Sequence, residues 1–335
     1  MIPMTTLTTT SLLPILRSSR QTDTSTIEKT RKPFIEANTR EVTLEHLQRE
    51  CIVPVFAKDN EVTISHNLFI QAVQTAVKDL FHGEYVMSPE VRVSHIIKGR
   101  TPDAIHKQAA DLTEQDKTIY YERMAFVMEV PAVSADIDGC KLNLSIGGVR
   151  AYNHENLFSR KVPEKFKVFI GFKNLVCCNL CVSTDGLCEE LRAFSPDELY
   201  HKVGALISRY RGEEHLNAMV SMLNYSLTES QFAQLIGKSR LYQFMPVVVK
   251  RKLPLLEFTD SHLNLIARNY YRDHDFAALT DTREINLWRL YNLFTGANKS
   301  SYIDSFLSRS VNATEFLQGI ARALEGNNRY RWWLE

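Results

Sequence analysis

Four cysteines lie close together near the middle of the chain, and two of them have the Cys-x-x-Cys spacing of a zinc site. They are Cys177, Cys178, Cys181 and Cys188. On an extended strand Cys178 and Cys181 point to opposite faces, and the sequence has no second Cys-x-x-Cys or histidine pair to accompany them. We therefore favour small thiols buried in a sheet over a metal site, and we expect no cofactor.

Two other short runs have side chains that are typical of ligand sites. Gly296–Ser300 is similar to the end of a phosphate-binding loop, but it lacks the glycine before the lysine and follows a helical pattern instead of a strand. Asp273, His274 and Asp275 diverge by about 100° each on a helix, so they do not converge on one ion. Because no Ser/His/Asp or Cys/His arrangement stands out either, we lean towards a non-enzymatic function.

A cluster of basic residues is the most informative chemical feature. Between Lys141 and Lys173 there are seven Lys or Arg and two acidic residues, a local balance of +5 in a chain whose net charge is +1. Aromatic residues are interleaved with these cations, as Phe169 is between Lys167 and Lys173. Cations that follow phosphates and rings that stack on bases together recognise single-stranded nucleic acid. The candidate nucleic-acid-binding residues are Arg92, Lys98, Arg100, Tyr121, Arg123, Arg150, Tyr152, Lys165, Lys167, Phe169 and Lys173.

The alternative is a solvated sheet face, or one covered by the C-terminal helices with Phe169 in a second core layer. Two connecting segments, Lys98–Pro102 and Gly147–Asn153, combine glycine with basic residues. They are either strand-end turns or grips for a phosphate. The sequence leaves both questions open.

The elements that must position these residues form an antiparallel sheet between Val91 and Asp185. Apolar and basic residues alternate most clearly at 165–173, where Phe166 shares one face with Val168, and Lys165 shares the other with Lys167. The other expected strands cover 91–98, 119–130, 141–149 and 176–183. The expected turns are at Pro131, Asp138-Gly139 and Asp185-Gly186. Short connections favour antiparallel neighbours.

Helices are expected before and after this sheet in the sequence. A short one covers 42–48, followed by a short strand at 52–56, and Ser65 caps a longer helix that ends before Gly83. Capping patterns beginning at Ser195, Thr228 and Asn312 indicate three later helices. Further helices are expected at 261–276, 285–294 and 302–309, with Ser300 or Ser301 capping the last. The pattern predicts an α+β protein with a central antiparallel sheet followed by a helical C-terminal half.

Composition sets the outer bounds. We expect a disordered N-terminal tail at 1–40, an α+β domain with the antiparallel sheet at 41–190, and a helical region at 191–335 that packs on the sheet or forms a second subdomain. No apolar run approaches the roughly 20 residues needed to cross a bilayer, so we expect no membrane partner. Six cysteines without an export signal predict a reducing, cytoplasmic setting.

Several long stretches carry a resemblance to a known family. They are RVSHIIKGRTP (Arg92–Pro102), TIYYERMAF (Thr118–Phe126), LSIGGVRAYNHENL (Leu144–Leu157), FKVFIGFKNLVCCNLCVSTDG (Phe166–Gly186) and LWRLYNLFTGANKSSYIDSFL (Leu287–Leu307). After about residue 45 the chain resembles domain-of-unknown-function family 3871, which is carried by gut anaerobic bacteria, their mobile elements and phages. The segment 177–185 is also similar, more weakly, to phage- and plasmid-borne proteins with a Cys-Asn pair after a strand. The resemblance implies DNA as a partner but brings no activity with it.

Two functions follow from these observations. The first is non-enzymatic, sequence-tolerant binding of single-stranded DNA or RNA, in mobile-element or phage DNA replication or recombination. The second is a protein–protein interaction or assembly module that acts on a host or element-encoded factor, with the helical C-terminal half as its docking surface. The sequence does not determine the oligomeric state.

Overall fold

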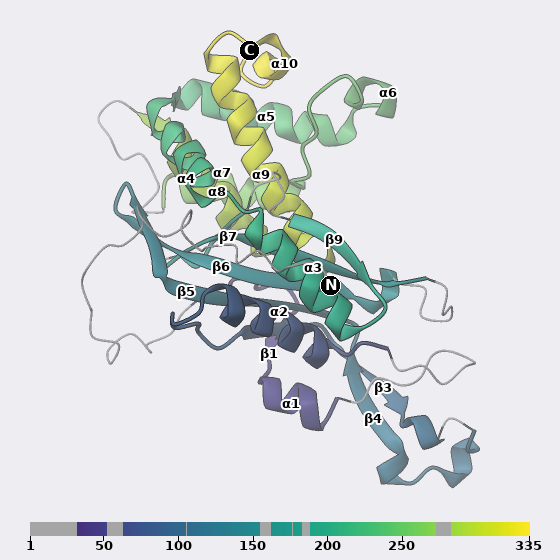
Figure 1. Cartoon of the computed structure of the whole chain (residues 1–335). Helices are drawn as coiled ribbons and strands as arrows, with labels where there is room; N and C mark the ends of the chain where they lie inside the picture. The colour runs from purple at the N-terminus through teal and green to yellow at the C-terminus, as the bar shows by residue number, and fades with distance from the viewer. Residues whose placement is uncertain are drawn as a thin grey trace.

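The computed structural model describes residues 32–51, 63–104, 106–154, 162–175, 177–182, 188–272 and 283–335. Residues 1–31 of the tail expected at 1–40, the strand expected at 52–56, the turn at 185–186 and the residues 273–275 lie outside this description. The centre of the fold is a seven-stranded antiparallel sheet with helices against both faces (Figure 1). Its strands are β1 (Arg40–Glu41), β2 (Glu90–Val93), β5 (Arg123–Ile137), β6 (Cys140–Ala151), β7 (Glu164–Asn174), β8 (Leu180–Cys181) and β9 (Cys188–Ala193).

A separate two-stranded sheet interrupts the strands expected at 91–98 and 119–130. The chain leaves the main sheet after Val93, forms β3 (Ile96–Arg100) and β4 (Lys117–Tyr121), and returns at Arg123. Ser94 holds the junction, since its Oγ atom accepts a hydrogen bond from the Arg123 amide at 3.1 Å. The β3–β4 hairpin therefore projects from the body at the end opposite α6 (Figure 1).

Two other expected features of the sheet differ from the structure. Pro131 does not mark a turn, because β5 continues through it to Ile137 with a register shift between Val130 and Ser134. A bulge tolerates proline since no ladder N–H is needed there. The turn at Asp138 and Gly139 is confirmed, with φ angles of 53° and 76°. Within the described residues 177–182 of the strand expected at 176–183, β8 is the strand, and Cys178 before it has a φ of 55°.

The helices account for most of the C-terminal part. They are α1 (Leu44–Arg49), α2 (His66–Leu80), α3 (Pro196–Ser208), α4 (Gly212–Ser221), α5 (Glu229–Phe244), α6 (Val247–Lys250), α7 (Asp260–Tyr270), α8 (Leu287–Asn298), α9 (Ile303–Leu324) and α10 (Asn328–Arg331), with a small sheet of β10 (Ser226–Thr228) and β11 (Glu284–Asn286). The caps at Ser65, Ser195 and Thr228 are confirmed, since each side chain accepts a backbone N–H from the first turn.

The helices expected at 302–309 and after Asn312 are one continuous helix, α9. Asn312 does not begin a helix: its side chain accepts from the Glu257 amide and donates to the Leu255 carbonyl of a neighbouring segment. Ser300 and Ser301 do not cap α9 either, because Tyr302 occupies the N-cap position and Ser301 donates to Asn298. A capping pattern inside a helix is thus explained by a tertiary contact.

The core joins sheet and helices. On the inner face of the sheet, α2 places Phe69 against Phe126 of β5 and Phe166 of β7. The same cluster of buried residues continues into the helical part, where Trp288 and Trp333 are fully buried. The fold class is therefore the α+β arrangement expected. Within the described ranges, no helix combines the length and apolar character needed to cross a bilayer.

Candidate functional site

The sheet face that carries the basic residues is partly covered. The first turns of α9 bring Ile303, Phe306 and Leu307 onto it, and Phe169 is only 1% exposed in the resulting cluster. Phe169 thus belongs to a second core layer, as in the alternative interpretation. Gly147 makes the room for it: a Cβ atom at that position would lie 2.6 Å from the Phe169 ring.

Arg150 lies on the opposite, inner face. It is opposite Met124 in the β5–β6 register, so it shares the face of Phe166. Its buried guanidinium pairs with Glu164 and lies 4.4 Å from the Phe166 ring centre and 4.5 Å from that of Tyr152. Its charge therefore serves the core. In the alternation of β6, Arg150 occupies a position of the apolar inner face, so its charge does not add to the basic face of the sheet.

Lys173 faces the basic side of the sheet but is fully enclosed. Its ammonium lies 2.9 Å from Glu90 and 3.1 Å from Glu129, and Asn143 donates to Glu129 at 2.9 Å. Burial acts to lower the pKa of Lys173, but the two carboxylates outweigh it and raise the pKa above its ordinary value. Lys173 thus keeps its charge inside the protein, where the two carboxylates balance it.

The two candidate tyrosines are also buried. Tyr121 accepts a hydrogen bond from Arg40 and lies 2.9 Å from the His46 ring nitrogen. Tyr152 stacks on His66 with the ring centres 4.4 Å apart. Together with Phe169, all three rings expected to stack on bases are core side chains in this structure.

Three other candidate cations do not line a common site with Lys165 and Lys167, although Arg92 shares their sheet face in register with Ala125. Arg92 donates to the Thr39 side chain and carbonyl. Lys98 and Arg100 belong to the β3–β4 hairpin, and Arg100 donates to the Lys107 carbonyl at 2.6 Å. Residues 96–121 contain four Lys or Arg and four acidic residues, so this hairpin has no excess positive charge.

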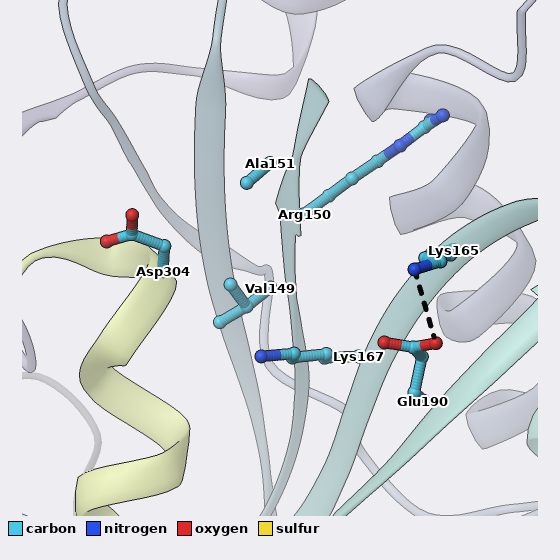
Figure 2. A pocket seen from close by; sticks show the side chains of 7 residues that line it. All are labelled: Val149, Arg150, Ala151, Lys165, Lys167, Glu190 and Asp304. Carbon is cyan, nitrogen blue, oxygen red and sulfur yellow. Dashed lines mark ion pairs between the residues drawn. The ribbon is translucent and has the colours of Figure 1, made fainter. Parts of the chain in front are cut away.

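Two of the remaining candidates, Lys165 and Lys167, lie at an open hollow of about 270 Å³ beside the start of α9, which Arg150 also lines (Figure 2). Lys165 and Lys167 line it, and Asp304 of α9 faces them. Arg123 lies 3.7 Å from Asp304, and Lys165 lies 3.9 Å from Glu190. Among the described residues Lys167 has no ion pair within 4 Å. Lys165 and Lys167 thus lie together at this solvent-accessible margin, whereas Arg123 is outside the lining and is paired with Glu122 and Asp304 beside it.

Sequence reasoning missed an exposed apolar surface on the helical half. We call it the α6 surface, and it consists of Leu241, Phe244, Val247, Val248, Val249 and Leu255. Phe244 is 82% exposed and Val248 is 70% exposed. The run Lys250-Arg251-Lys252 follows at once, with Arg251 and Lys252 in solvent. Three valines directly after a proline at a helix end were the available signal.

Contacts with the body fix the α6 surface in place. Lys250 reaches back to α5, donating to the Gln243 carbonyl at 2.7 Å with its ammonium 5.3 Å from the Tyr242 ring centre. The Gln243 side chain accepts from the Asp260 amide at 3.0 Å, and Arg240 pairs with Asp260 at 2.7 Å. The exposed apolar side chains therefore sit on an anchored segment.

Two of the clustered cysteines are held as neutral thiols. Burial raises the pKa of Cys177 to about 12 and that of Cys181 further. Thiolates are the form that binds metal and attacks electrophiles, so neither is prepared for that chemistry. Across the ranges that the structure covers, no three His, Cys, Asp or Glu side chains are placed to hold a metal ion.

These features define an α+β protein. The chain belongs to the family described as "Domain of unknown function, B. Theta Gene description (DUF3871)", whose model matches residues 17–334. No curated protein and no solved structure matches the chain.

Proposed function

We propose that this protein is an interaction module that docks onto a protein partner through the α6 surface. The observation that carries the proposal is the set of apolar side chains exposed between residues 241 and 255 on an anchored segment. Proteins rarely leave such side chains together in water unless a partner covers them. Phe244, with its large rigid ring, is the expected anchor of the contact.

Charge complementarity indicates the kind of partner. Lys250, Arg251 and Lys252 border the apolar side chains, so the partner is an apolar groove with an acidic rim. A two-fold contact between copies of this chain would set these cations against each other. A membrane-surface helix needs a long apolar face, whereas these side chains come from a helix end, a four-residue helix and a loop.

The setting of the family supports a particular source of the partner. The resemblance to proteins of mobile elements and phages implies that the chain works beside host and element-encoded factors. A docking module for one of these factors fits the second function expected from the sequence.

Site-specific cross-linking tests the proposal. A photo-cross-linking residue at position 244 of the full chain should label one protein in the cell, and the same residue at exposed Tyr85 should not. With that partner purified, Phe244→Ser should weaken binding by about 2 kcal/mol, roughly 30-fold, whereas Tyr85→Ser should leave it unchanged. Arg251→Glu with Lys252→Glu should slow association.

Binding of a second copy of the chain or of a membrane at the α6 surface would contradict the proposal. Cross-links between two copies of the chain, with concentration-dependent dimerisation in sedimentation, would assign the α6 surface to self-association. Flotation with anionic phospholipid vesicles, lost in Phe244→Ser, would assign it to a membrane.

A separate observation supports a second candidate function. We propose that Lys165 and Lys167 at this hollow, with Arg123 beside it, contact the phosphates of a single-stranded nucleic acid. The rings of Tyr121, Tyr152 and Phe169 do not take part, because they are buried. Binding would be electrostatic and sequence-tolerant, as replication or recombination of a mobile element requires.

Salt dependence tests this candidate. If three cations each neutralise one phosphate, log Kobs for a single-stranded oligonucleotide should fall against log salt with a slope of about −2. Lys165→Glu with Lys167→Glu should abolish binding, whereas Lys141→Glu, an exposed lysine outside the hollow, should not. Absent or salt-independent binding at low ionic strength would contradict it. Nucleic-acid absorbance in freshly purified protein would favour this candidate over the docking module.

A further inference from the structure

A second hollow, of about 190 Å³, lies at the end of α8. Lys299 and Asn292 line it from the α8 side, Arg268 and Asn269 from α7, and Lys32 from the N-terminal segment. This site contains the Gly296–Ser300 run that looked similar to a phosphate-binding loop in the sequence. Neither binding surface proposed above includes it.

Lys299 is the unusual member of this site. Its side chain is buried, with the residue only 5% exposed, and its ammonium donates to the Cys177 carbonyl. In the described part of the chain no carboxylate lies within 4 Å of it. Burial lowers the pKa of Lys299 below its ordinary value, because a charge without a counter-ion is costly inside a protein. An anion in the hollow would remove this cost.

The other groups around the hollow also favour an anion. Lys32 and Arg268 are exposed at its mouth, and Glu36 is the acidic residue among its lining side chains, so the local charge is +2. Asn179 contributes a buried Oδ1 atom that has no hydrogen-bond partner. That oxygen needs a donor, and a hydroxyl group on a bound molecule would supply one.

The geometry points to a site for a phosphate monoester, bound by Lys299 and Arg268 with Asn179 accepting from a ligand hydroxyl. The dianionic charge of a phosphate monoester matches the local charge of the site, and an arginine fork with a lysine suits its oxygens. The size of the hollow limits the bound part to a small molecule or to the terminal phosphate of a longer one.

The site would not work as a phosphate-binding loop does. The backbone amides of Lys299, Ser300 and Ser301 donate to the carbonyls of the last turn of α8. These amides are therefore occupied, and the phosphate would be held by side chains from different elements instead of by a cradle of backbone N–H groups.

Calorimetry on the full chain tests the inference, with inorganic phosphate as the first probe and sodium chloride at equal ionic strength as its control. A trinucleotide with a 5′-phosphate, compared with the same trinucleotide without it, tests whether the phosphate comes from a nucleic-acid end. We expect phosphate to bind and to raise the melting temperature. Removing one charge-assisted contact in Arg268→Gln should weaken binding at least about tenfold, whereas Arg272→Gln, near the same helix end but outside the lining, should not.

Lys299→Met separates binding from folding. If Lys299 is kept for a ligand, this variant should lose phosphate binding and keep the wild-type melting temperature in phosphate-free buffer. The inference is overturned if phosphate and chloride act alike, if Arg268→Gln binds as tightly as Arg272→Gln, or if Lys299→Met loses stability while Arg268→Gln leaves binding unchanged. Equal binding of sulfate would reduce the site to a general anion site and would also overturn it.

Discussion

At the scale of single residues, buried ionisable groups are matched to partners inside this fold. Arg150 is paired with Glu164 on one face of the sheet, and Lys173 is paired with Glu90 and Glu129 on the other. A buried charge without such a partner costs several kcal/mol, so each cation and its acids act as a unit. Lys299 departs from this pattern, which is why it carries the inference of a ligand site.

Buried histidines make the stability of the protein depend on pH. Burial lowers the pKa of His215 to about 4, whereas an unfolded histidine titrates near 6.5. Between these values the unfolded chain binds a proton that the folded chain does not, so stability is full above pH 6.5 and falls as pH drops towards 4. We expect His215→Leu to reduce this pH dependence by up to about 1.4 kcal/mol per pH unit.

Urea unfolding at pH 7 and pH 5 measures this effect. His201 is exposed on α3, so His201→Leu serves as the matched control. An identical loss of stability between the two pH values in His215→Leu and wild type would show that His215 titrates normally in the folded state.

At the scale of elements, polar side chains connect segments that have no sheet or helix hydrogen bonds to each other. Asn312 on α9 holds the loop at 255–257, and Gln243 on α5 holds the start of α7. The connection by Asn312 places Leu256 and Phe258 in the core. The sequence pattern around Asn312 matches a capping box, but the side chain is used across elements.

Removing this connection should destabilise the protein. Asn312→Ala leaves the Glu257 amide and the Leu255 carbonyl without their partner, which should cost about 1–3 kcal/mol in the free energy of unfolding. Chemical denaturation measures the change. Glu315→Ala, exposed on the same helix, should be nearly neutral, and equal effects of the two substitutions would contradict the role given to Asn312.

At the scale of the whole molecule, the C-terminus closes the helical part. Trp333 is fully buried against Tyr242 of α5 and Phe316 of α9, so the end of the chain docks onto the body. Trp332 is only partly buried, with the Lys238 ammonium 5.2 Å from its ring centre. Trp332 therefore serves as a control for the loss of the buried Trp333 side chain.

Trp333→Ala should lower the free energy of unfolding by about 3–5 kcal/mol, because a large cavity opens between α5 and α9. Trp332→Ala should cost clearly less, since part of its side chain is already exposed to water. Thermal or urea unfolding of both variants measures the difference. If Trp332→Ala were the more damaging change, the packing described for the C-terminus would be wrong.

Local sequence patterns by themselves determined the strands at 141–149 and 165–173, the turn at Asp138 and Gly139, and the caps of α2, α3 and α5, because these depend on local backbone geometry. Which face of the sheet is exposed to water was decided only by the tertiary structure. The face of Lys165 and Lys167 is lysine-rich in sequence, yet α9 covers its middle and leaves its margin open, since α9 reaches it from more than a hundred residues away. The α6 surface is likewise visible only once the other helices have buried their own apolar side chains elsewhere.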